Sequence, residues 1–501
     1  MNLRSNGKWK RAAFYAAIFV GLMLFFVYAH PLYIYDVDDW TYVSSPRPAV
    51  PMPFGWNPTR ILPEILMPLA AQFGVSCINP FLQDYIQSLA IAFALVLSGV
   101  IVAYLGCLDH LLQKVYQLKK ERYLLLLMIL LWHFLPGCTE KAGWQHMFCA
   151  GNVTGVFYYT IPSLFNMSAA FLVMSGCKLS KKNDVLLNGA MLLGIYLCIN
   201  SNMYLSIILA VAVSGELFCA WLKELKNGKK FWTAVRIIIC ENGVKTGIVC
   251  MWFLSILLER TGGRARWASD TKSFQLGKTL LYFVQSIKAL NLIWLTGTAG
   301  MVAAALIVCA MVVKRGGTAE AKRLDAVYLH QMAVCGFSFV ISIVYLILLS
   351  AMVNPQYIMG TSMKFSWIIW CFCALTVSMA YLLRRCPKTA ALLPLLLCIV
   401  VSVTVTDGDV YMDNGAASYN VQTMKQLDEN IIRQAQEAEK NGLKSVEIKI
   451  PKHESETWPL ALSYGGERIA RTLYRHGLTQ TQLEIQLVMD EEINRQFGLE
   501  H

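Results

Sequence analysis

The stretch VYLHQMAVCGFSFVISIVYLILLSAM, residues 327–352, contains no Asp, Glu, Lys or Arg. A helix of about 20 apolar residues is long enough to cross the hydrocarbon core of a bilayer. This stretch therefore predicts a membrane-spanning helix, and it is typical of most of the chain. Hydrophobic residues make up 56% of the 501 residues and charged residues only 15%, which excludes a set of ordinary soluble domains and a disordered chain.

Comparable apolar runs recur throughout residues 1–405. They predict an all-α polytopic membrane protein with about eleven transmembrane helices, near residues 12–29, 83–106, 122–137, 153–175, 184–199, 203–222, 240–258, 290–313, 327–352, 364–384 and 389–405. The segment 274–289 has apolar residues at helical spacing with two lysines between them, which favours a helix that lies in the membrane interface.

The distribution of charge predicts the orientation. Residues 406–501 contain 10 Lys and Arg against 16 Asp and Glu, a net charge of −6, whereas residues 1–405 carry +18 and the whole chain +12. The positive excess lies in short loops between alternate apolar runs, as is typical of cytoplasmic loops. We therefore expect the N-terminus inside, the C-terminus outside and no nucleic-acid-binding face.

The tail, residues 406–501, is expected to form a small extracytoplasmic α+β module. Its pattern predicts a helix at 421–441, a strand at 445–450, and helices at 465–476 and 480–496.

The fifteen cysteines are scattered, and no pair has the spacing of a zinc or redox motif. Most are expected to behave as small buried hydrophobic residues. Cys77, Cys138 and Cys149 fall on the expected outer side, where one disulfide is permitted.

The richest polar stretch is the expected outer loop 30–82, which opens with three acidic residues, Asp36, Asp38 and Asp39. Carboxylates this close together repel one another, so one of them is expected to have a raised pKa. Such a group can act as a general base or coordinate a divalent cation. The alternative is a solvated acidic turn that only ends a helix.

The same loop carries Trp40, Trp56, Asn57 and Arg60. Aromatic rings beside carboxylates suit a sugar, and a guanidinium suits a phosphate oxygen. The alternatives are an interfacial aromatic belt and an ion pair between Arg60 and an aspartate.

Two other expected outer segments add candidate ligand-binding residues. Segment 139–152 supplies Lys141 and Trp144, and loop 259–272 supplies Arg264 and Arg266. Arginines in an outer loop run against the usual bias, and an anionic ligand at the outer leaflet would explain them. Structural ion pairs are the competing explanation.

These features together resemble a known family. A basic N-terminus, a first helix, the motif YDVDDW at 35–40 and WNPTR at 56–60 resemble the GT-C class of integral membrane glycosyltransferases. The chain is most similar to the bacterial glucosyltransferases that decorate O-antigen and related surface polymers. The run IPKHESETWPLALSYGGERIARTLYRHG at 450–477 resembles the outer C-terminal portion of those proteins.

The resemblance implies a polyprenyl-phosphate sugar donor and a surface glycan acceptor at a bacterial plasma membrane. It implies that Asp38 or Asp39 is the catalytic acid or base and that Arg60 helps to bind donor or acceptor, beside Asp36 and the aromatic residues. The late outer loop, 354–362, lacks the arginine expected for the lipid phosphate and has only Lys364 nearby. Arg264 or Arg266 is then the expected substitute.

Two rival hypotheses come from other classes. One is a transporter or flippase for a lipid-linked glycan, and the other is a non-catalytic envelope assembly protein. Charged residues within the apolar runs are few and lie close to helix ends, which gives a proton-coupled transporter little support.

Overall fold

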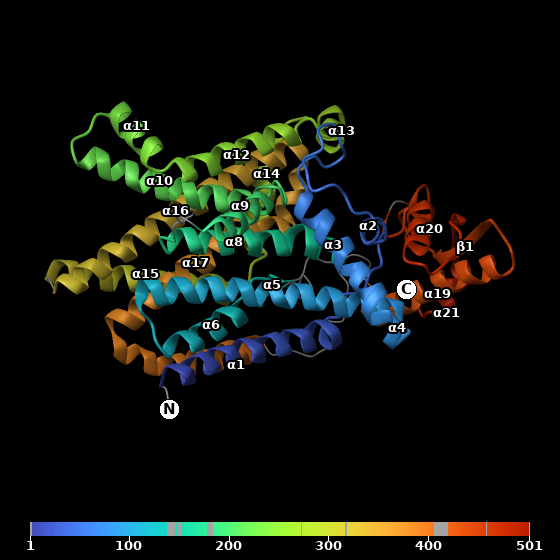
Figure 1. The fold of residues 1–501 in the computed structure, drawn as a ribbon, viewed down its shortest axis with the longest axis horizontal. Helices are drawn as coiled ribbons and strands as arrows, with labels where there is room; N and C mark the ends of the chain where they lie inside the picture. Colours follow the sequence, from blue (N-terminus) through green and yellow to red (C-terminus); the bar gives the residue numbers. More distant parts are fainter. Residues whose placement is uncertain are drawn as a thin grey trace.

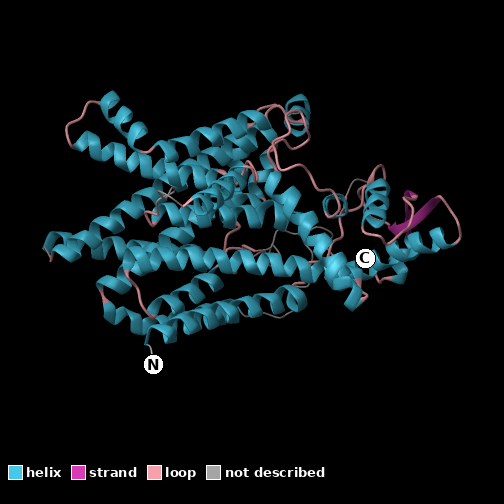
Figure 2. Ribbon diagram, in the orientation of Figure 1, coloured by secondary structure: helices cyan, strands magenta, loops and turns pink. Residues whose placement is uncertain are grey.

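The computed structural model describes residues 3–137, 146–148, 152–177, 184–271, 273–315, 318–404, 419–456 and 458–499. Helices of residues 3–404 lie along the long axis of the molecule, and a small module of residues 419–499 stands at one end (Figure 1). Strands occur in the described chain only in this module (Figure 2).

Each of the eleven apolar runs forms a helix over most of its described residues. A helix satisfies its backbone amides and carbonyls with internal hydrogen bonds, which suits a segment that is shielded from water. The helices of the bundle, in chain order, are α1 (Leu3–Leu24), η1 (Phe25–Ala29), α2 (Val37–Tyr42), α3 (Ile61–Phe73), η2 (Gly74–Ile78), α4 (Asn79–Leu82), α5 (Tyr85–Tyr116), α6 (Glu121–Trp132), α7 (Val153–Gly155), η3 (Val156–Thr160), α8 (Ile161–Met174), α9 (Val185–Ile199), α10 (Ile207–Lys226), α11 (Phe231–Glu241), α12 (Gly243–Glu259), α13 (Gly263–Thr271), α14 (Leu276–Lys288), α15 (Leu292–Arg315), α16 (Ala319–Val353), η4 (Pro355–Met359), α17 (Thr361–Arg385), η5 (Pro387–Leu392) and α18 (Leu393–Thr404).

Seven helical stretches among the described residues are long and apolar enough to cross a membrane. The pair α11 and α12, which bends by 95°, makes an eighth if it is counted as one span. The predicted spans at 122–137, 184–199, 203–222 and 389–405 are helical but are not among these. The molecule is thus a helical membrane protein. The segment expected in the interface, 274–289, is helical as α14.

One stretch of the expected outer loop is not a loop. Residues 61–82 form the continuous helical stretch α3, η2 and α4, which is itself apolar enough to span. Pro63 and Pro68 lie within this stretch and are buried, and prolines are tolerated in apolar helices whose neighbours bury them. The end of α1 and the start of α5 nevertheless lie at the same end of the bundle (Figure 1). The stretch 61–82 therefore does not carry the chain to the other end.

The C-terminal module pairs two parallel strands, β1 (Ser445–Pro451) and β2 (Glu484–Asp490), with helices α19 (Val421–Lys440), α20 (Gly465–Arg475) and α21 (Glu491–Gln496). The prediction of a helix throughout 480–496 is wrong, because 484–490 is a strand. Its side chains alternate: Ile485 and Leu487 are buried while Glu484 and Gln486 are exposed. This period of two is a strand pattern, and the α+β character of the module is confirmed.

The module packs directly on α2. The Val37 N–H donates to the Pro459 carbonyl at 3.0 Å, and the Thr472 hydroxyl donates to the Trp40 carbonyl at 2.6 Å. Arg475 donates to the Ser44 carbonyl at 2.7 Å. These bonds join residues more than 400 positions apart, so the tail determines where the acidic turn lies.

Asp428 of α19 is buried in this contact. Its side chain is fully inaccessible, and neither carboxylate oxygen has a hydrogen bond within 3.5 Å. Burial raises the pKa of Asp428 well above its ordinary range, the carboxyls of Asp39 and Asp36 add to the rise, and the indole of Trp40 opposes it. A buried carboxyl in such a place is held in its neutral form.

We expect this group to make stability depend on pH. In the unfolded chain Asp428 ionises above about pH 4, whereas in the folded protein it keeps its proton to a higher pH. The free energy of unfolding must therefore fall as pH rises through that interval. Asp428→Asn, which resembles the neutral acid, should remove this dependence and raise the melting temperature more at pH 8 than at pH 5.

The control is Glu437→Gln on the same helix, where an exposed ion pair with Arg433 is expected to matter little. Parallel pH profiles for the wild type and Asp428→Asn would contradict the interpretation.

Candidate functional site

The acidic turn is organised by its first residue. The Asp36 carboxylate caps α2 by accepting hydrogen bonds from the N–H groups of Asp38 at 2.9 Å and Asp39 at 3.0 Å. A side-chain oxygen at this position satisfies amides that have no partner within the helix. The helix α2 begins directly after Asp36, so Asp38 and Asp39 lie on different faces of it. Asp39 is 1% exposed, whereas Asp38 is exposed to solvent.

Asp39 is fully occupied by hydrogen bonds. One carboxylate oxygen accepts from the N–H of Thr154 at 2.6 Å and from its hydroxyl at 2.7 Å. The other accepts from the N–H of Tyr35 at 3.2 Å. Burial raises the pKa of Asp39 to about 6, although these hydrogen bonds oppose the rise. The Asn152 amide donates to Asp36 in the same region, so both acids hold α2 against α7.

Asp38 has no such partner. Desolvation by the surrounding protein raises the pKa of its carboxyl, and the charges of Arg264 and Arg60 lower it. No ion pair within 4.0 Å joins Asp38 to either arginine. The exposed carboxylate therefore lies in the field of two cations without touching them.

Arg60 is buried without a polar partner. It is 3% exposed, and its side chain makes no hydrogen bond or ion pair with the described residues. The guanidinium lies over the ring of Tyr158, with 5.5 Å from its central carbon to the ring centroid. A buried charge that lacks hydrogen bonds is costly. The alternative that Arg60 forms an ion pair with an aspartate does not hold in this structure.

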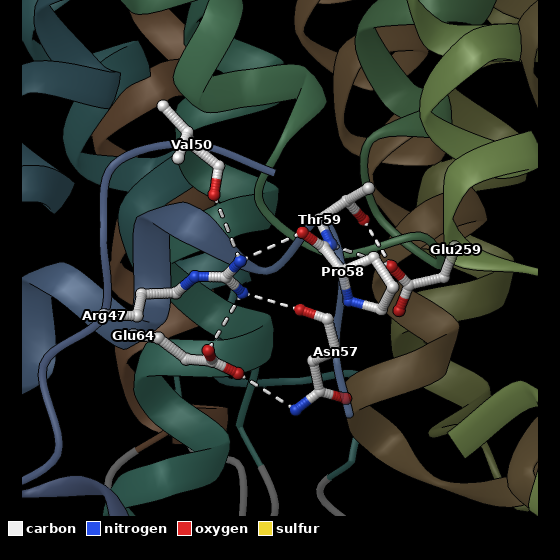
Figure 3. A network of polar contacts seen from close by, with 7 residues as sticks. All are labelled: Arg47, Val50, Asn57, Pro58, Thr59, Glu64 and Glu259. Atoms are coloured by element: carbon white, nitrogen blue, oxygen red, sulfur yellow. Dashed lines mark hydrogen bonds and ion pairs between the residues drawn. The ribbon is translucent and has the colours of Figure 1, made fainter. Parts of the chain in front are cut away.

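The neighbouring arginine shows the opposite arrangement (Figure 3). Arg47 contacts the Glu64 carboxylate at 3.0 Å and donates to the carbonyls of Asn57, Pro58 and Val50 at 2.6, 3.0 and 3.3 Å. The Asn57 amide donates to the other oxygen of Glu64 at 2.9 Å. Arg47 and Glu64 thus hold the loop that leads to Arg60, and the Asn57 side chain belongs to this structural network.

The same loop docks on the end of α12 and the beginning of α13. The Thr59 N–H and hydroxyl both donate to the buried Glu259 carboxylate, at 3.0 and 2.6 Å (Figure 3). The Arg264 N–H donates to the Trp56 carbonyl at 3.2 Å. These contacts cross about 200 residues of sequence and bring Arg264 to the same side as Asp38 and Arg60.

The two arginines of α13 have different surroundings. The Arg264 side chain interacts with three phenol groups, those of Tyr159, Tyr357 and Tyr204. Arg266 is exposed and donates to the Phe54 carbonyl at 3.3 Å. Of the two, Arg264 is the one whose charge acts on Asp38.

The tryptophans also differ. Trp40 is fully buried beneath the C-terminal module, so its ring offers no face to a ligand. Trp56 is 56% exposed, and its ring lies against Gly263, where an added Cβ would lie 2.9 Å from the ring. Lys141, Trp144, Cys138 and Cys149 lie outside the described residues. Cys77 is an exposed free thiol.

Sequence reasoning missed the partners that define the site. Thr154 and Asn152 fix the two buried aspartates, and Tyr158 supports Arg60. These residues are about 100 positions from their partners, and a single sequence carries no signal for such pairs.

No group of three or more His, Cys, Asp or Glu side chains in the described ranges is arranged to hold a metal ion. Comparisons with family models, with curated proteins and with solved structures found no match.

The docked loop gives a test of this geometry. A Cβ at Gly262 would lie 2.5 Å from Cδ of Pro58, which leaves no room for alanine. Overpacking of this kind typically costs about 1–3 kcal/mol. We expect Gly262→Ala to lower the melting temperature and to increase protease cleavage within residues 47–60.

Gly277→Ala is the matched control, because a Cβ at Gly277 meets nothing within 4 Å. Equal behaviour of the two variants would show that the loop is not docked in this way.

Proposed function

We propose that this protein is a membrane glycosyltransferase that moves a sugar, a hexose such as glucose, from a polyprenyl-phosphate donor to a cell-surface glycan. The proposal rests on two charged groups near the acidic turn that make no hydrogen bond or ion pair with the described residues. Asp38 has a free carboxylate near two arginines, and the buried Arg60 has no polar partner. An anion placed between these groups would satisfy Arg60 and leave Asp38 beside it.

The chemistry of transfer suits these groups. The acceptor hydroxyl gives its proton to the Asp38 carboxylate while its oxygen bonds to the anomeric carbon of the sugar. The bond from that carbon to the phosphate oxygen breaks, and the electron pair leaves with the phosphate. A carboxylate whose pKa is raised by desolvation is a stronger base. Arg60 and Arg264 would stabilise the negative charge that develops on the phosphate.

Of the two candidate bases, Asp38 is favoured over Asp39. The hydrogen bonds to Thr154 and Tyr35 occupy Asp39, and its carboxylate is not accessible. Asp36 is likewise committed to capping α2. In this proposal Trp56 is the exposed ring available to the sugar or the acceptor.

The proposal includes an orientation in the membrane. About eleven spans, an internal N-terminus and an external C-terminal module would place Asp38 at the outer surface of a bacterial plasma membrane. The basic loops support this orientation, since positive charge collects on the cytoplasmic side. The donor lipid would then reach the site from the outer leaflet.

A transporter or flippase for a lipid-linked glycan, and a non-catalytic assembly protein, are the competing functions. Neither of these functions requires a free base at the outer surface. Loss of the Asp38 carboxylate should therefore lower the activity of a transferase but not that of a transporter or an assembly protein.

We expect Asp38→Asn to lower the rate of sugar transfer by about 10²–10⁴-fold, the usual contribution of a general base. Protein abundance should stay normal, because the side chain is exposed. The assay measures transfer of glucose from polyprenyl-phosphate glucose to surface glycan in isolated membranes. Glu437→Gln is the control with an unchanged rate. Full activity of Asp38→Asn would exclude Asp38 as the base.

A second prediction concerns Arg60. Arg60→Lys keeps the charge but loses the planar fork that binds two phosphate oxygens, so we expect transfer to fall more than tenfold with little change in melting temperature. Arg47→Lys provides the contrast, because Arg47 holds the loop through four contacts. That variant should lower the melting temperature. A fully active Arg60→Lys enzyme would remove Arg60 from the site.

A further inference from the structure

A cavity of about 1270 Å³ lies at the end of the bundle far from the C-terminal module. The ends of α5, α8 and α17 and the beginnings of α12 and α16 surround it. Nothing in the proposed transfer reaction uses it. About half of its lining is polar, which is unusual for a space within an apolar bundle.

Cationic side chains outnumber carboxylates around this cavity. The five cations in the lining are Lys114, Lys245, Arg323, Arg384 and Arg385, and the three carboxylates are Glu216, Glu241 and Glu320.

The carboxylates neutralise only part of this charge. Glu216 contacts His330 at 3.1 Å and Lys245 at 3.8 Å, and Glu320 contacts Arg384 at 2.7 Å. Arg385 lies 3.7 Å from Asp325.

Two cations are left without a carboxylate. Arg323 and Lys114 are exposed and form no ion pair with the described residues. The Lys114 ammonium has only a long contact with the Cys177 sulfur, at 3.6 Å. Glu241 likewise forms no ion pair with the described residues, so the cavity presents two available positive charges and one carboxylate.

The beginning of α12 adds to this positive character. Asn242, Gly243, Val244 and Lys245 all line the cavity. Asn242 gives α12 no side-chain cap, because its amide donates instead to the Ile238 carbonyl at 3.2 Å. The first N–H groups of a helix without a cap attract anions, and the helix dipole adds to the effect.

The helix α11, whose last residue lines the cavity, is suited to contact with lipid. α11 turns away from α12 by 95° and ends at Glu241, which lines the cavity. Its first residues, Phe231 and Trp232, are 50% and 78% exposed. A helix with exposed aromatic residues that lies across the bundle is typical of the membrane interface.

We propose that this cavity binds a phosphate group, with Arg323, Lys114 and the first amides of α12 as its ligands. Two sources share this chemistry: the headgroup of an anionic phospholipid and a soluble phosphate ester. The site is independent of the proposed sugar transfer, because it lies at the other end of the bundle and its test needs no activity.

The test measures dissociation constants for the full-length protein in neutral detergent. The probes are dioctanoyl phosphatidic acid, glycerol 3-phosphate and the uncharged dioctanoylglycerol. We expect Arg323→Gln and Lys114→Gln each to weaken binding of a phosphate probe by about tenfold, the effect of losing one hydrogen bond between charged groups. Lys226→Gln is the matched control, since Lys226 is exposed at the end of α10 but does not line the cavity.

Binding of phosphatidic acid alone supports a lipid headgroup, and binding of glycerol 3-phosphate supports a soluble ester. Arg60→Lys should leave this binding unchanged, which separates the cavity from the site near Asp38. Binding of neither phosphate probe overturns the proposal. So does equal affinity for dioctanoylglycerol, or binding that Arg323→Gln and Lys114→Gln leave at the level of Lys226→Gln.

Discussion

The hydrogen bonds from Thr154 to Asp39 hold the acidic turn in place, and the geometry of the candidate site depends on them. They join α2 to α7 across 115 positions of sequence. With Asp39 turned inward and Asp36 capping the helix, Asp38 is the one acid of the three left facing solvent. The C-terminal module closes over the other side of α2 through Val37 and Trp40, so two distant parts of the chain determine where this carboxylate lies.

Arg47 and Arg60 lie in the same loop but differ in their polar partners. Arg47 has a carboxylate and three carbonyls as partners, so its charge is paired within the protein. Arg60 is more deeply buried, and among the described residues its guanidinium contacts only the ring of Tyr158. This uncompensated charge lies close to the exposed carboxylate of Asp38. An anionic ligand explains both features, and a purely structural role explains neither.

Composition and apolar runs were enough to predict the helical membrane fold, because burial in a membrane requires long stretches with no charge. The sequence also pointed to the acidic turn, to Arg60 and to Arg264. The prediction was wrong at 61–82, which is helical although it was assigned to the outer loop, and at 484–490, where a short alternating strand follows a turn. It left Asp38 and Asp39 unresolved, because their difference depends on Thr154, and the contact of Thr59 with Glu259 was equally invisible.

A structure of the protein with a bound polyprenyl-phosphate sugar is the most direct measurement of the central claim. The account predicts the phosphate within hydrogen-bonding distance of the Arg60 guanidinium and beside Arg264, with the anomeric carbon of the sugar facing the Asp38 carboxylate. A phosphate bound away from both arginines, with Arg60 still lacking a polar partner, would contradict it.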